Sequence, residues 1–114
     1  MWIRRKVKPG NQTGRKLGYP TINFNEGNFG DDYKPGVYTC EVLIGDKIYK
    51  GALYFGPKLD RPGFALEIYV LDYSGNLYSE HVQFKPVRWL RAPQRFNSKE
   101  ALKKQIQKDI ASIV

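Results

Sequence analysis

The chain has 114 residues, of which 41% are hydrophobic and 14% aromatic, values that fit one folded domain over residues 1–114 and exclude a disordered chain. Because no stretch approaches the ~18 apolar residues of a membrane helix and the lone Cys40 cannot form an internal disulfide, we expect a cytoplasmic protein without a membrane partner. The net charge of +8 favours nucleic acid or a phosphate-bearing small molecule as partner, although a basic surface also serves solubility.

The N-terminal stretch combines cations with regularly spaced glycines. Glycine recurs at Gly10, Gly14 and Gly18. The sequence of this stretch matches neither of the two common nucleotide-binding loop motifs. Glycines nevertheless let backbone N–H groups approach an anion, and nearby cations add attraction. The stretch therefore predicts either a phosphate-binding loop or a purely structural one. The cations close to it are Arg4, Arg5, Lys6, Lys8, Arg15 and Lys16.

An extended segment is expected next, over residues 21–24, because Pro20 biases the residue before it away from helical angles. Thr21 and Asn23 are two positions apart, so their side chains point to the same side of such a segment. Oxygen donors beside a basic loop are what a magnesium–phosphate group needs. The alternative is that Thr21 and Asn23 satisfy backbone groups at a turn.

Strand-like runs fill the middle of the chain. Gly45-Asp46 joins the first two of them and predicts a tight hairpin. A turn at residues 74–76 ends the third run (64–73). The fourth run (77–84) is interpreted as the hairpin partner of the third, and the fifth run (87–90) continues or follows the fourth. The five runs are residues 37–44, 47–55, 64–73, 77–84 and 87–90.

Glu67 interrupts a run in which both alternating sets of residues are apolar. A strand of that kind should be covered on both faces, where a lone carboxylate costs free energy unless it is paired or used. Glu67 is therefore a candidate general base for a hydroxyl group, and a salt bridge to a cation is the alternative. His81 and Cys40 are single residues of their kinds, so they form no zinc cluster within the chain and are interpreted as structural.

One helix is expected at the C-terminal end. It begins at Asn97 or Ser98, with Asn97 and Glu100 as a capping pair, and the apolar residues Leu102, Ile106 and Ile110 repeat every fourth position. Short strands with one terminal helix indicate a small antiparallel barrel or sandwich. Arg91, just before the helix, is suited to hold a planar polar ligand or to bond carbonyls at the strand end.

Taken in order, these pieces resemble the riboflavin kinase family in its single-domain form. The most specific motif is G-x-x-x-G-R-x-L-G-Y-P-T-x-N-F over residues 10–24. It is followed by GVY at residues 36–38, LEIYVLDYSGNLYS at 66–79 and LRAPQRFNSKEALKKQIQKDI at 90–110. The chain departs from the family pattern at residues 54–58, at Ser79 and at Pro93.

The resemblance implies a mainly β fold, a six-stranded antiparallel Greek-key barrel with a C-terminal α-helix. It implies transfer of the γ-phosphate of ATP to the 5′-hydroxyl of riboflavin, which gives FMN. Thr21 and Asn23 would serve the metal, Mg²⁺ with Zn²⁺ or Mn²⁺ as alternatives, and Glu67 would be the base. Glu67, Arg91 and Phe96 would border the flavin. The residues at the ATP phosphates would be Gly10, Gly14, Arg15, Lys16, Gly18, Pro20 and Thr21.

The same resemblance implies a monomer whose partners are riboflavin, FMN, ATP and ADP, with no role for nucleic acid. Because Met1 stands nine residues before Gly10, FAD synthesis by a preceding domain is not expected. Two alternatives stay open at this stage. One is a non-catalytic basic barrel that binds single-stranded nucleic acid, and the other is a degenerate relative that binds flavin without turnover.

Overall fold

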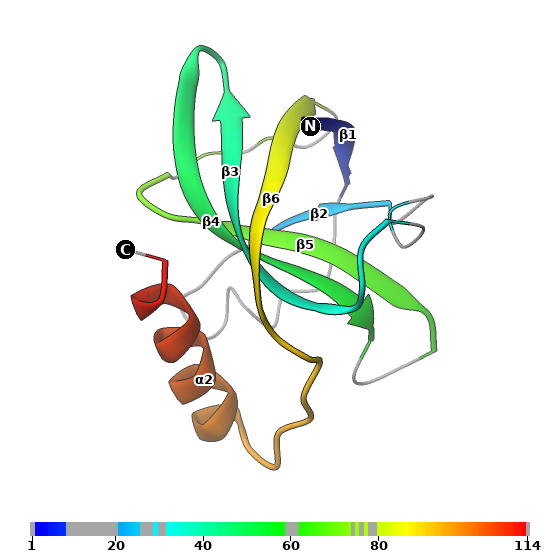
Figure 1. Ribbon diagram of the computed structural model, residues 1–114, viewed down its shortest axis with the longest axis vertical. Coiled ribbons are helices and arrows are strands. Elements are labelled where there is room, and N and C mark those ends of the chain that lie inside the picture. The colour runs from blue at the N-terminus through cyan, green and yellow to red at the C-terminus, as the bar shows by residue number, and fades with distance from the viewer. Residues whose placement is uncertain are drawn as a thin grey trace.

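The computed structural model describes residues 2–8, 21–25, 29, 32–58, 62–73, 75, 77 and 80–113. Within these residues the chain forms a barrel of β-strands with one α-helix beside it (Figure 1). The strands are β1 (Ile3–Lys8), β2 (Ile22–Phe24), β3 (Gly36–Ile44), β4 (Lys47–Pro57), β5 (Phe64–Val70) and β6 (His81–Arg91), and the helix is α2 (Lys99–Ala111).

The six strands close into an antiparallel barrel in the order β1-β2-β5-β4-β3-β6. Within it β3, β4 and β5 are consecutive neighbours, and β6 returns to lie beside β3, which is the Greek-key arrangement. The predicted fold class is therefore confirmed. The β3–β4 hairpin is confirmed too: Ile44 pairs with Lys47 across the two-residue turn, where Gly45 has a φ of 65°.

Two expectations about the strands were wrong or incomplete. Residues 77–84 were expected to pair with the preceding strand, but β6 begins at His81 and pairs with β1 and β3, whereas β5 pairs with β2 and β4. An alternating pattern predicts a strand and its faces, and the closure of the barrel decides the partner. β1 was not predicted, because four of its six residues are cations.

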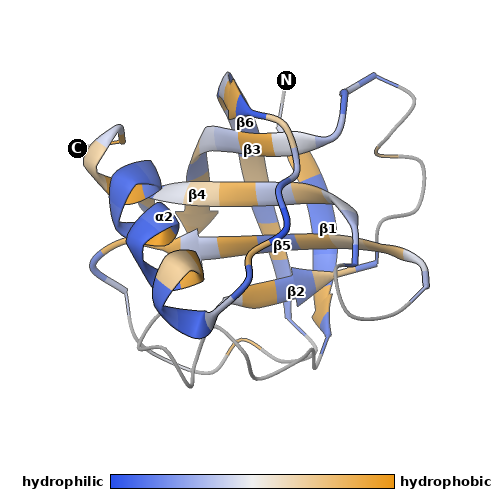
Figure 2. Cartoon of the chain, turned by 90° about the horizontal axis from the view of Figure 1, so that it is seen from below, coloured by the Kyte–Doolittle hydropathy of each residue, from blue (hydrophilic) through white to orange (hydrophobic). Residues whose placement is uncertain are grey.

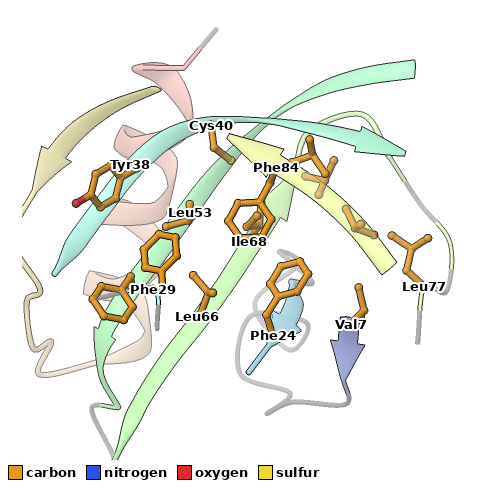
Figure 3. Close-up of a cluster of buried hydrophobic side chains, with 14 residues drawn as sticks. Val7, Phe24, Phe29, Tyr38, Cys40, Leu53, Leu66, Ile68, Leu77 and Phe84 are labelled. Atoms are coloured by element: carbon orange, nitrogen blue, oxygen red, sulfur yellow. The ribbon is translucent and has the colours of Figure 1, made fainter. Parts of the chain in front are cut away.

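The core lies inside the barrel and is built from the inward-facing residues of every strand (Figure 3). Alternation is strict in β5, where Leu66, Ile68 and Val70 are buried and the residues between them are half-buried on the outer face. Outward residues are thus available for a site. The largest fully buried side chains are Phe24, Phe84, Leu53, Leu66, Ile68, Val7 and Val42.

Helix α2 packs on the outside of the barrel against β4 (Figure 2). Its N-cap is Ser98, whose Oγ accepts a hydrogen bond from the backbone N–H of Ala101 at 3.1 Å. The predicted start at Ser98 is confirmed, but Ser98 and Ala101 make the cap in place of Asn97 and Glu100. The apolar stripe is only half-buried, and the buried residue of the helix is Asp109.

Cys40 lies in the core with 2% of its surface exposed, and burial raises the pKa of its thiol to about 12. We expect the native protein to resist thiol reagents at pH 8 and to react fully in denaturant, because the thiolate is the reacting species. Titration with a chromogenic disulfide reagent measures this. Because the pKa is raised on folding from 9.0, the thiol's contribution to stability is complete below pH 9 and is lost as the pH rises towards 12. Rapid labelling of the folded protein would contradict the expectation.

Candidate active site

The barrel register places Asn23 and Glu67 opposite each other on neighbouring strands. Asn23 of β2 pairs with Glu67 of β5, while the next pair, Phe24 with Leu66, points into the core. Because side chains alternate along a strand, Asn23 and Glu67 share the outer face. Directly paired residues on one face lie about 5 Å apart at their Cβ atoms. An amide and a carboxylate are therefore immediate neighbours on the outer side of the barrel.

Asn23 has only 9% of its surface exposed, and its orientation suits a cation ligand. Its Nδ2 donates a hydrogen bond to the backbone carbonyl of Thr21 at 3.4 Å. With the nitrogen end turned to the backbone, Oδ1 is the end of the amide that can meet a metal ion. Thr21 is half-buried just before β2. Two neutral oxygen donors beside a carboxylate fit a hard divalent cation that takes its other ligands from phosphates and water.

Tyr54 joins this face, and the sequence did not point to it. It pairs with Glu67 from β4, and its hydroxyl donates to the carbonyl of Pro57 at 2.6 Å. Burial raises the pKa of Tyr54, the Glu67 carboxylate raises it further, and Arg91 lowers it. The three side chains therefore share one electrostatic environment. In the sequence, residues 54–58 stand out as a departure from the family pattern, which gives no role to Tyr54.

The position of Gly56, beside Tyr54, has no room for a side chain. A Cβ on Gly56 would lie 2.9 Å from the Tyr54 hydroxyl and 3.1 Å from Cγ of Pro93. The Tyr54 ring and Pro93 therefore close over this glycine, which brings the chain after β6 against β4. Pro93, another departure from the family pattern, borders the same face as Glu67.

Arg91 is held by the C-terminal helix. Its Nε donates to Oδ1 of Asp109 at 3.0 Å and its Nη2 to Oδ2 at 2.9 Å, a two-pronged pair. Gln105 donates to the same carboxylate at 3.1 Å, and Nη1 of Arg91 donates to the carbonyl of Ala92 at 3.3 Å. Of the two roles considered for Arg91, carbonyl bonding is present. The main partner, however, is a carboxylate that the sequence analysis did not identify.

Phe96 lies close to this ion pair. The guanidinium carbon of Arg91 is 5.9 Å from the centre of the Phe96 ring, which is half-buried. Arg91 and Phe96 are thus brought together, as their assignment to one side of a ligand requires. Binding of a flavin there remains a prediction.

The residues expected at the nucleotide phosphates fall mostly outside the described part of the chain. The undescribed residues of this group are Gly10, Gly14, Arg15, Lys16, Gly18 and Pro20. Their roles stay predictions. Ser79, a departure from the family pattern, also lies outside the described residues. Among the described residues, no group of three or more His, Cys, Asp or Glu side chains could hold a metal ion. The described helix is also too short and too polar to cross a membrane.

Comparison with known proteins identifies the family. The family model named Flavokinase, described as riboflavin kinase, matches residues 1–114. The chain belongs to the riboflavin kinase family. The family suggested by the motifs at residues 10–24 and 66–110 is thereby confirmed.

Two curated riboflavin kinases illustrate the similarity. An RNA-binding riboflavin kinase of Bacillus subtilis is 33% identical over 97% of this chain, and the match covers 49% of that relative. A bifunctional riboflavin kinase/FMN adenylyltransferase of Escherichia coli is 36% identical over 94% of this chain and 35% of its own length. The chain thus spans half or less of these relatives.

Solved structures agree on the fold. A structure described as a macrolide-efflux protein from Streptococcus pneumoniae superposes with a TM-score of 0.82 at 25% identity, over 98% of this chain and 38% of that one. Riboflavin kinase from Trypanosoma brucei superposes with a TM-score of 0.69 at 23% identity, over 98% of this chain and 76% of that one. The second likeness supports the barrel architecture alone.

Proposed function

We propose that this chain transfers the γ-phosphate of ATP to the 5′-hydroxyl of riboflavin and releases FMN and ADP. The observation that carries the proposal is the pairing of Asn23 with Glu67 on the outer face. It sets a carboxylate next to an amide whose oxygen can face a metal–nucleotide complex. Membership of the riboflavin kinase family supports the same reaction.

Glu67 acts as the general base in this proposal. Its carboxylate takes the proton of the 5′-hydroxyl as the hydroxyl oxygen forms a bond to the γ-phosphorus. The bond from that phosphorus to the ADP oxygen breaks at the same time, and ADP leaves. Phosphoryl transfer depends mainly on positioning and on neutralisation of charge, so the base adds to an arrangement that the binding groups hold in place.

Thr21 and Asn23 would hold a divalent cation, which when bound neutralises charge on the β- and γ-phosphates. Mg²⁺ suits their oxygen donors best, and assays with Zn²⁺ and Mn²⁺ decide the preference. On the other side, Arg91 and Phe96 would border the flavin. Because the fork of Arg91 is bound to Asp109, we assign Arg91 mainly the task of positioning the segment that carries Phe96.

Replacing Asn23 with Ala should raise the Mg²⁺ concentration needed for half-maximal activity by about tenfold, because one oxygen ligand is lost. The measurement is initial FMN formation at saturating riboflavin across an Mg²⁺ titration. Asn97→Ala makes the same change at an exposed position before α2 and should leave the titration unchanged. An Asn23→Ala protein with the wild-type Mg²⁺ dependence would remove Asn23 from the metal site.

The reaction itself is tested by incubating the purified chain with riboflavin, ATP and Mg²⁺ and separating the products by chromatography. The proposal predicts FMN and ADP in equal amounts. Tight flavin binding without FMN would indicate a flavin-binding relative without turnover. Salt-sensitive retention of single-stranded oligonucleotide without any response to riboflavin would indicate a nucleic-acid-binding barrel. Either result would overturn the proposal.

A further inference from the structure

Lys8 lies in the same row of the barrel as Asn23 and Glu67. It pairs with Asn23 where β1 meets β2, and the adjacent pair is Val7 with Phe24. Val7 and Phe24 are each 1% exposed and belong to the core (Figure 3). Strand alternation therefore directs Lys8 and Asn23 to the outer face, where Lys8 is exposed.

The row therefore carries three different functional groups on three adjacent strands. Lys8 is cationic, Asn23 offers an amide oxygen, and Glu67 is a carboxylate. Neighbouring strands lie about 4.8 Å apart, so the backbones at Lys8 and Glu67 are separated by roughly 10 Å with Asn23 between them. The flexible stem of a lysine lets its ammonium group reach over the neighbouring strand. A positive charge is thus available beside the proposed metal ligand and within reach of a group bound in front of it.

We propose that Lys8 contacts the terminal phosphates of the nucleotide at this face, an inference that rests on the proposed kinase function. A metal-bound triphosphate keeps a net negative charge, and that charge shifts towards the leaving ADP during transfer. A cation beside Asn23 offsets it, as lysines do in other phosphoryl-transfer sites. Lys8 is the described cation that the register sets directly beside Asn23.

Lys6 is a matched comparison on the same strand. It is exposed on the same outer face two residues earlier, but it pairs with His81 of β6. Two residues along a strand span about 6.7 Å. Lys6 therefore contributes a similar long-range field and differs from Lys8 in its distance from Asn23.

The test compares Lys8→Met with Lys6→Met in steady-state FMN formation. Lys8→Met should raise KM for MgATP by about tenfold, the loss expected for one charge-assisted contact. It should leave KM for riboflavin within twofold, and Lys8→Arg should recover most of the loss. Lys6→Met should stay within twofold of wild type in every constant. Equal effects of the two Met variants would mean that Lys8 contributes only to the overall positive electrostatic potential, and they would overturn the proposal.

A binding measurement separates this inference from the proposed function. Calorimetric titration with MgADP in the absence of riboflavin should give about tenfold weaker binding to Lys8→Met than to wild type. If the wild-type chain binds MgADP but forms no FMN, the kinase proposal fails, and the MgADP titration still tests whether Lys8 contacts the nucleotide. If Lys8→Met binds MgADP as wild type does, the inference on Lys8 fails and the kinase proposal stands. A shifted pH dependence of kcat with unchanged KM would mean that Lys8 acts through Glu67, which also overturns the inference.

Discussion

Replacing Glu67 with Gln should lower kcat for FMN formation by about a thousandfold, because general-base catalysis contributes roughly 10² to 10⁴ in rate. The amide keeps the size of the side chain and its place opposite Asn23 and Tyr54, but it cannot take the proton of the 5′-hydroxyl. Riboflavin binding should change little, since the substrate still meets a polar group of the same shape. Stopped-time assays for kcat and fluorescence titration for riboflavin affinity measure the two effects separately.

Glu41→Gln is the control for this change. Glu41 lies on β3, where it forms a half-exposed ion pair with Lys85 at 3.4 Å, so the same substitution there removes a carboxylate outside the proposed site. It should leave kcat within twofold. A Glu67→Gln protein with wild-type kcat would remove Glu67 as the base. A protein that loses riboflavin affinity and rate in parallel would make Glu67 a binding residue instead.

Replacing Arg91 with Met should destabilise the fold by about 3 kcal/mol. The Asp109 side chain is only 9% exposed and its two oxygens are held by Arg91, so loss of the guanidinium leaves a buried carboxylate without its counter-charge. Met keeps the apolar stem of the side chain and isolates the effect of the charge. Urea denaturation followed by tryptophan fluorescence measures the change in the free energy of unfolding.

Lys85→Met provides the comparison for that experiment. The Lys85–Glu41 pair is open to water, with side chains 38% and 39% exposed, and exposed pairs contribute at most about 1 kcal/mol. Adding Asp109→Leu to Arg91→Met should recover much of the lost stability, because no buried charge remains without a partner. Equal losses in Arg91→Met and Lys85→Met would contradict the anchoring role of the Arg91–Asp109 pair.

Local patterns in the sequence were sufficient for much of the fold. The Gly45-Asp46 turn predicted the β3–β4 hairpin, the apolar run around Glu67 predicted β5, and residues 97–98 predicted the start of α2. Each of these signals depends on neighbours along the chain. The partner of β6 depends on closure of the barrel, and β1 is held by pairing with β2 and β6 in spite of its cations. Neither could be read from a window of the sequence.

The candidate site likewise has features that the local sequence predicted and features that depend on pairing between distant elements. Asn23 and Glu67 were singled out by residue type and position as a candidate oxygen ligand and a candidate base, and the resemblance to the family implied the same roles. Their direct pairing is a matter of register between strands more than forty residues apart in sequence, which no local pattern contains. Tyr54 and Asp109 were missed for a related reason. Each acts through a partner on another element, Tyr54 beside Glu67 and Asp109 on Arg91.

In the proposed reaction, one outer face of the barrel serves two substrates, and the register places a separate group of residues on each side of that face. Lys8, Asn23 and Thr21 come from β1, β2 and the residue before β2, on the side proposed for the nucleotide. Arg91 and the segment after it come from β6, at the end held by α2. Glu67 lies between the two groups, where a base must stand if it is to act on a hydroxyl approaching a phosphate.

Transfer of label from γ-labelled ATP to riboflavin tests the central claim most directly. The purified chain is incubated with riboflavin, labelled ATP and Mg²⁺, and the label in the FMN fraction is counted alongside the Glu67→Gln protein. We predict that each FMN formed by the wild-type chain carries one label, and that the variant forms almost no labelled FMN in the same time. A folded wild-type chain that labels no FMN with Mg²⁺, Zn²⁺ or Mn²⁺ would contradict the account, and so would equal labelling by the two proteins.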